Sequence, residues 1–152
     1  MIKRILVPID FSDFSIDALK YGVSVARHFG AKILLLHVIS QELLNEVKAV
    51  QYFSGIIDSP EKFLARKKRD INERIEKILK GETDQTLFEE PLIEVGIPTE
   101  EIIRVAKERK VDLVVIATRG RSGLSHILMG SVAEKVVRRS PCPVLSVRGK
   151  EF

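Results

Sequence analysis

The sequence predicts an α/β fold in which a parallel β-sheet is covered on both faces by helices. Short runs of consecutive apolar residues are typical of buried parallel strands. Longer segments with apolar residues at helical spacing lie between these runs. The two kinds of segment alternate as βαβαβαβαβ, an order that favours right-handed crossovers between parallel strands. The chain has 152 residues, a length that suits one domain, and we expect a single domain over residues 1–152.

The first part of the chain predicts two strands joined by a helix. Residues 2–9 contain a dense apolar run that indicates a buried strand. Ser12 can cap a helix over residues 14–29, and Gly30 suits the end of that helix. Residues 33–38 form a second apolar run and predict the second strand.

The middle of the chain is less regular. Residues 41–59 contain apolar residues together with a glycine, and we expect a short helix and a mobile loop there. Residues 61–80 show apolar residues at helical spacing with charged residues between them, which predicts a long amphipathic helix. Residues 86–95 predict the third strand, and Pro91 within it indicates an edge position or a bulge.

The last part of the chain predicts two further helices and strands. Pro98 suits the first position of a helix over residues 99–109. Residues 111–116 predict the fourth strand, residues 130–139 the last helix and residues 144–147 the last strand.

Composition narrows the classes of function. The net charge is +4, and part of it comes from a basic run at residues 66–69. That run lies in a helical pattern without interleaved aromatic residues, so we favour a solvated helix face over nucleic-acid binding. The single cysteine, Cys142, excludes an internal disulfide and favours a reducing compartment. No run approaches the roughly 20 apolar residues of a membrane span, and we expect a cytoplasmic protein without membrane association.

The segment most informative about function follows the fourth predicted strand. Residues 117–123 read Ala-Thr-Arg-Gly-Arg-Ser-Gly, and Gly130-Ser131 stand at the start of the last helix. The glycines let backbone N–H groups approach phosphate oxygens, and free N–H groups at a helix start attract anions. The two arginines add charge that suits phosphate. The alternative is a glycine-rich turn that serves only a tight strand-to-helix connection.

Other candidates lie where the first two strands end, because ligands of open α/β sheets bind at the carboxyl ends of the strands. Asp10 could accept hydrogen bonds from ribose hydroxyls or cap the next helix, and we favour the ligand role. Pro8 and Val38 could wall a flat apolar ring or belong to the core. His37 is more typical of a satisfied core histidine, and Cys142 of a packed thiol than of a nucleophile. We find no cluster of metal-ligating residues.

Several segments together resemble the universal stress protein family. They are Ile5-Leu6-Val7-Pro8-Ile9-Asp10-Phe11-Ser12, Leu34-Leu35-Leu36-His37-Val38, Gly96-Ile97-Pro98 and a closing block from Gly120 through Gly130-Ser131 to Pro141-Cys142-Pro143-Val144. The resemblance implies an open five-stranded parallel sheet in the flavodoxin-like strand order 3-2-1-4-5. It also implies a homodimer formed through the last strand, residues 144–148.

Nucleotide-binding members of this family carry the motif G-x2-G-x9-G-[S/T]. Gly120, Gly130 and Ser131 match it, whereas Ala117 stands at the first glycine. The added methyl group blocks binding if the position needs positive φ or if the methyl meets the ligand, and we expect binding to be retained. The site implied by the resemblance consists of Pro8, Ile9, Asp10, Val38, Ile116, Ala117, Thr118, Arg119, Gly120, Arg121, Ser122, Gly123, Gly130, Ser131 and Val132.

The resulting hypothesis is a regulator of the stress response that binds an adenine nucleotide, ATP or AMP, with Mg²⁺ carried by the nucleotide. No catalytic residue is assigned, because no general base, metal cage or activated nucleophile is evident, and we expect at most slow ATP hydrolysis. The alternative is a universal stress protein that binds a protein partner and no nucleotide, with the apolar residues 41–57 as its contact surface. The sequence does not identify that partner.

Overall fold

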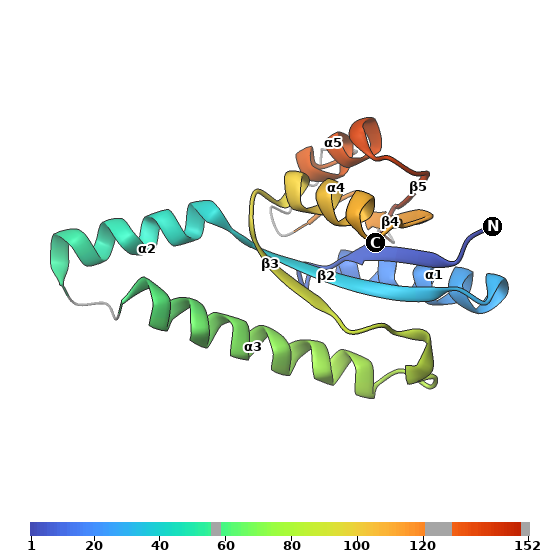
Figure 1. The fold of residues 1–152 in the computed structure, drawn as a ribbon, viewed down its shortest axis with the longest axis horizontal. Coiled ribbons are helices and arrows are strands. Elements are labelled where there is room, and N and C mark those ends of the chain that lie inside the picture. The colour runs from blue at the N-terminus through green and yellow to red at the C-terminus, as the bar shows by residue number, and fades with distance from the viewer. Residues whose placement is uncertain (56–58, 121–128, 150–152) are drawn as a thin grey trace.

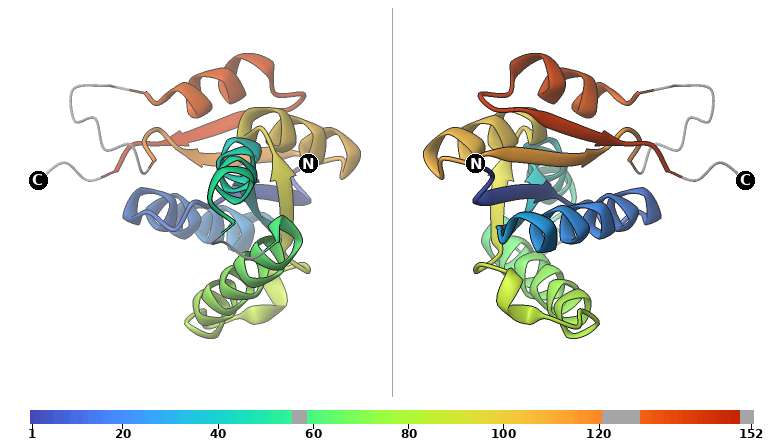
Figure 2. Two further views of the ribbon diagram at one scale, coloured as in Figure 1. Left: turned by 90° about the vertical axis from the view of Figure 1, so that its left-hand side faces the viewer. Right: turned by 90° about the vertical axis from the view of Figure 1, so that its right-hand side faces the viewer.

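The computed structural model describes residues 1–55, 59–120 and 129–149. Their strands form one five-stranded parallel sheet in the order β3-β2-β1-β4-β5, as the resemblance implied. Figures 1 and 2 show helices on both sides of this sheet. The elements are β1 (Arg4–Pro8), α1 (Asp13–Phe29), β2 (Lys32–Ser40), α2 (Gln41–Ser54), α3 (Pro60–Lys80), η1 (Gln85–Leu87), β3 (Leu92–Gly96), α4 (Pro98–Glu108), β4 (Leu113–Ala117), α5 (Ser131–Arg139) and β5 (Val144–Val147).

Two apolar clusters hold the layers together, one on each face of the sheet. On one face, alternate residues of the central strands pack against α1 and against Ile71 and Ile75 of α3. On the other face, the intervening strand residues pack against Ile102 and Val105 of α4 and against α5. Because side chains alternate along a strand, a strand that is buried on both faces must be continuously apolar, as β4 is.

The helix ends follow the predicted capping residues. The Ser12 side chain accepts a hydrogen bond from the Ser15 amide at the start of α1, and Gly30 ends that helix with a φ of 66°. Only glycine adopts this left-handed conformation without steric cost. Pro98 occupies the first turn of α4, where its missing N–H is not needed. These observations confirm the predicted cap and end of α1 and the predicted start of α4.

The prediction of a strand over residues 86–95 was wrong in its first half. Asp84 accepts hydrogen bonds from both the amide and the hydroxyl of Thr86, and a 3-10 turn covers Gln85–Leu87. Pro91 then has no N–H to donate to a sheet ladder, so β3 begins at Leu92. β3 is an edge strand, as Pro91 indicated.

The helices α2 and α3 form a hairpin, which we call the α2–α3 hairpin, and α2 and the beginning of α3 extend beyond the end of the sheet (Figure 1). The sequence predicted only a short helix at its start, but α2 is 14 residues long. Leu44 and Val47 are buried near its base, whereas the Tyr52 and Phe53 side chains are 85% and 84% exposed near its end. Among the described residues, no helix is both long and apolar enough to cross a lipid bilayer.

Candidate functional site

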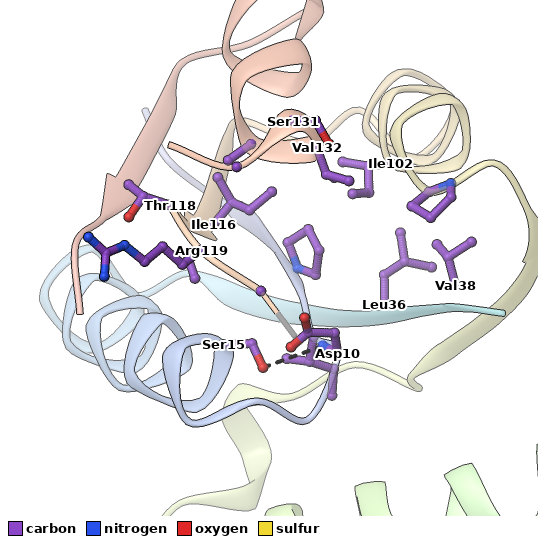
Figure 3. A pocket seen from close by; sticks show the side chains of 17 residues that line it. Asp10, Ser15, Leu36, Val38, Ile102, Ile116, Thr118, Arg119, Ser131 and Val132 are labelled. Carbon is purple, nitrogen blue, oxygen red and sulfur yellow. Dashed lines mark hydrogen bonds between the residues drawn. The ribbon is translucent and has the colours of Figure 1, made fainter. Parts of the chain in front are cut away.

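A pocket opens at the carboxyl ends of β1, β2 and β4, beside the starts of α4 and α5 (Figure 3). β1 and β4 are neighbours in the sheet although β2 and β3 follow β1 in the chain. The crossovers therefore leave β1 and β4 toward opposite edges, which creates the crevice where α/β proteins bind ligands. The cavity has a volume of about 360 Å³, within the range of small-molecule sites.

One side of the pocket is apolar. Leu36 and Val38 come from β2, Pro98 and Ile102 from α4, and Ile116 from β4. Pro98 and Ile102 are four residues apart and so share a face of α4. These side chains form a surface suited to a flat apolar group such as a heterocyclic ring.

Asp10 lies on the opposite, polar side of the pocket (Figure 3). One carboxylate oxygen, Oδ1, accepts hydrogen bonds from the Ser12 amide at 2.9 Å and from the Ser12 hydroxyl at 2.5 Å. Ser12 itself caps α1, so Asp10 supports the capping residue instead of capping the helix. The other oxygen, Oδ2, faces Gly120, because a Cβ added to that glycine would lie 2.7 Å from it.

The two motif glycines in the described part of the loop lie close to groups from other segments. A Cβ on Gly120 would collide with Asp10, and a Cβ on Gly130 would lie 3.3 Å from the Thr118 carbonyl oxygen. The Gly130 amide donates a hydrogen bond to that carbonyl at 2.5 Å. These glycines therefore let the backbone after β4 lie against both Asp10 and the start of α5.

Ser131 is the first residue of α5 and is not its N-cap residue. Gly130 is the N-cap residue, and because glycine has no side chain it makes no capping hydrogen bond to the first turn of the helix. The Ser131 side chain is exposed and borders the pocket. Free N–H groups at the start of a helix form an electropositive site that favours anions.

Ala117 is the residue at which the chain departs from the family motif. It is the last residue of β4, pairs with Val147 and does not have a positive φ. Although it borders the pocket, it also packs in the apolar cluster on the α1 face of the sheet. The conformation of this position therefore does not require glycine.

Thr118 and Arg119 follow β4 at the edge of the pocket. The Thr118 hydroxyl is buried and has no hydrogen-bond partner within the described part of the chain. The Arg119 side chain extends outward, on the opposite side of the site from Leu36 and Val38 (Figure 3). In this arrangement its guanidinium group is not directed at the apolar surface.

His37 and Cys142, the remaining candidates from the sequence, both lie in packing and hydrogen-bonding contacts within the fold. His37 is buried, and its Nδ1 donates a hydrogen bond to the Ile9 carbonyl at 2.7 Å. Cys142 is half-buried, with its Sγ 3.6 Å from the Ser140 hydroxyl. Over residues 1–55, 59–120 and 129–149, no group of three or more histidine, cysteine, aspartate or glutamate residues could hold a metal ion.

All predicted site residues that the structure describes border this one pocket. Arg121, Ser122 and Gly123 lie outside the described residues. The sequence analysis missed five further lining residues, which come from α1, β2, α4 and α5. They are Ser15, Leu36, Pro98, Ile102 and Ala133. Leu36 was detectable, because it lies two residues before Val38 and therefore on the same face of the strand.

Comparisons with known proteins agree with this architecture. Residues 1–148 match the profile of the universal stress protein family. The universal stress protein MJ0577 of Methanocaldococcus jannaschii is 35% identical over 160 residues, which span 99% of this chain and 97% of the relative. The solved structure of MJ0577 covers 100% of this chain and 99% of its own, with a TM-score of 0.83 and 33% identity.

Two further relatives are informative. The universal stress protein YxiE of Bacillus subtilis is 34% identical, over 97% of this chain and 100% of its own. A universal stress protein solved in complex with cAMP has a TM-score of 0.59 and 27% identity, and the match covers 97% of both chains. The profile match, the sequence relatives and the similarity to solved structures together lead to one conclusion: the chain belongs to the universal stress protein family.

Proposed function

We propose that this protein binds an adenine nucleotide, ATP or AMP, in the pocket at the ends of β1, β2 and β4. The observation that carries the proposal is that one cavity combines an apolar surface, an aspartate and the start of a helix whose N-cap residue is a glycine. These three parts match the base, the ribose and the phosphates of a nucleotide in chemical character. A solved relative, 27% identical, binds the nucleotide cAMP, which supports the same class of ligand here.

Each part of the nucleotide has a proposed partner. Pro8, Val38 and Ile102 pack against the adenine ring, and Asp10 accepts hydrogen bonds from the ribose hydroxyls. The phosphates lie against the backbone after β4 and against the start of α5. The full set of proposed binding residues is the set predicted from the sequence, Arg121, Ser122 and Gly123 included, together with the additional lining residues.

The role that fits this site is regulation, with the nucleotide as the signal that the protein senses in a stress response. Mg²⁺ enters with the nucleotide phosphates, and catalysis is limited to slow ATP hydrolysis. We place the protein in the cytoplasm. We also propose a homodimer formed through β5, an edge strand that pairs with β4 on one side and carries the exposed Leu145.

Calorimetric titration with ATP and Mg²⁺, and separately with AMP, tests the proposal. We expect one saturable site per chain. Gly130→Val should abolish binding, because its Cβ would already lie 3.3 Å from the Thr118 carbonyl oxygen, so a branched side chain would push apart the backbone after β4 and the start of α5. A flat titration of folded wild-type protein would reject nucleotide binding.

A second candidate function is supported by the α2–α3 hairpin. Tyr52 and Phe53 are largely exposed there and contact each other edge to face, with ring centroids 5.3 Å apart. Exposed aromatic side chains are typical of protein interfaces, so this hairpin is the contact surface if the protein binds a protein partner and no nucleotide. Native mass spectrometry of freshly purified protein separates the two functions, because a co-purified nucleotide excludes the second one.

A further inference from the structure

The residue after Asp10 has an unusual backbone conformation. Phe11 has a φ of 66°, in the left-handed region that bulky side chains rarely adopt. Such conformations persist where the surrounding contacts over-determine them, and they concentrate at ligand-binding sites. The contacts of Phe11 therefore indicate what holds the turn that presents Asp10 to the pocket.

Two side chains from distant parts of the chain contact the Phe11 ring. The guanidinium carbon of Arg74, on α3, lies 4.2 Å from the ring centroid, a distance at which a cation–π interaction is favourable. The imidazole ring of His37, on β2, lies 4.9 Å from the Phe11 ring, centroid to centroid. Phe11 is thus held between α3 and the sheet.

His37 also fixes the residue on the other side of Asp10. Its Nδ1 donates a hydrogen bond to the Ile9 carbonyl at 2.7 Å. Both sequence neighbours of Asp10 are therefore in contact with the same imidazole ring. The Ser12 amide then bonds to the Asp10 carboxylate at 2.9 Å and completes the turn.

We propose that Arg74, Phe11 and His37 are positioning residues that hold the Asp10 carboxylate in the orientation in which it meets the ligand. The inference rests on the proposed function, since it concerns the same pocket. None of the three side chains is among the described residues that line the cavity. They act through Asp10, and Arg74 makes the α2–α3 hairpin part of the support of the ligand site.

Substitutions of Arg74 test this inference by calorimetry with ATP and Mg²⁺. Arg74→Met removes the charge, Arg74→Lys keeps a cation, and Arg69→Met is the matched control on an exposed part of the same helix. We expect Arg74→Met to weaken binding about two- to tenfold, because the loss is limited by the strength of one cation–π contact. Arg74→Lys should lose less affinity for ATP than Arg74→Met does, and Arg69→Met should bind ATP with wild-type affinity.

A double-mutant cycle distinguishes positioning from a general loss of structure. In the Asp10→Ala background, Arg74→Met should cause no further loss, because the carboxylate that it positions is gone. An equal loss in both backgrounds would overturn the inference. Wild-type affinity in Arg74→Met would also overturn it.

A measurement without ligand separates this inference from the proposed function. Hydrogen exchange of the Ser12 amide, followed by NMR, should be faster in Arg74→Met than in the wild type and unchanged in Arg69→Met. Unchanged exchange in Arg74→Met rejects the positioning role. If the wild type binds no nucleotide, the proposed function fails, and the exchange rates still decide whether Arg74 holds the turn.

Discussion

Replacing Gly120 with alanine should separate ligand binding from folding. The new Cβ would lie 2.7 Å from Asp10 Oδ2, a distance that real Cβ atoms essentially never show. Either the carboxylate rotates away or the backbone after β4 retreats. Both movements would remove the proposed hydrogen bonds between Asp10 and the ribose hydroxyls, and hydrogen bonds to a charged group contribute about 1.5–3 kcal/mol. We therefore expect the affinity for ATP to fall about ten- to a hundredfold.

Gly81→Ala is the matched control, because it adds the same methyl group away from the pocket. Gly81 has a φ of −76°, and its added Cβ would lie 3.4 Å from the Ile78 carbonyl oxygen, an ordinary contact. Calorimetry should show wild-type affinity for this variant. Thermal unfolding should remain cooperative for both variants, which shows that the loss in Gly120→Ala is not a loss of the fold.

The result that refutes the reasoning is wild-type affinity in Gly120→Ala. It would mean that Gly120 and Asp10 do not need to approach each other in the complex. A second check combines Gly120→Ala with Asp10→Ala, which removes the carboxylate that the methyl group meets. The combined variant should bind no more weakly than Asp10→Ala alone.

Three further predictions concern Ala117, Asp112 and Gly30. Ala117→Gly should leave the affinity for ATP within about twofold and lower the free energy of unfolding by about 0.5–1 kcal/mol, because glycine weakens a strand; a large gain in affinity measured by calorimetry would contradict this. The amides of Lys3 and Arg4 donate hydrogen bonds to the Asp112 carboxylate and lower its pKa below the ordinary value of an aspartate. A carboxylate whose pKa is lowered by folding stabilises the folded state at a pH above its unfolded pKa, and this stabilisation is lost as the pH falls through the folded pKa. In urea unfolding below about pH 4, the free energy of unfolding should therefore fall less with acidification in Asp112→Asn than in the wild type. Gly30→Ala should cost about 1–2 kcal/mol, because φ is 66° there although the space is open; unchanged denaturant unfolding would contradict it.

Many elements were predictable because their signals are local. The apolar run of β4 and the spacing of Ile71 and Ile75 on α3 can be recognised in short windows. The strand predicted from residue 86 failed for an equally physical reason. The side chain of Asp84 competes for the backbone N–H of Thr86 and favours a turn over a sheet ladder.

The sequence was sufficient to predict most of the residues that line the pocket, but not which residues contact one another. The sequence places Asp10, Gly120 and Gly130 after strands whose carboxyl ends meet at one edge of the sheet. The contact of Phe11 with Arg74 joins residues 63 positions apart, and no local sequence pattern predicts it. Likewise, Pro98 and Ile102 become pocket residues only because α4 packs against β2 and β3.

The amino-acid sequence alone determined the family, the alternating elements and the residues that converge on one edge of the sheet, because apolar periodicity, caps and motif glycines act over a few neighbouring residues. Only the tertiary structure decided which way the Ala117 methyl group packs, how closely Gly120 approaches Asp10, and that α3 braces the turn at Phe11. These depend on distances between segments far apart in the chain, and packing of the whole core sets such distances.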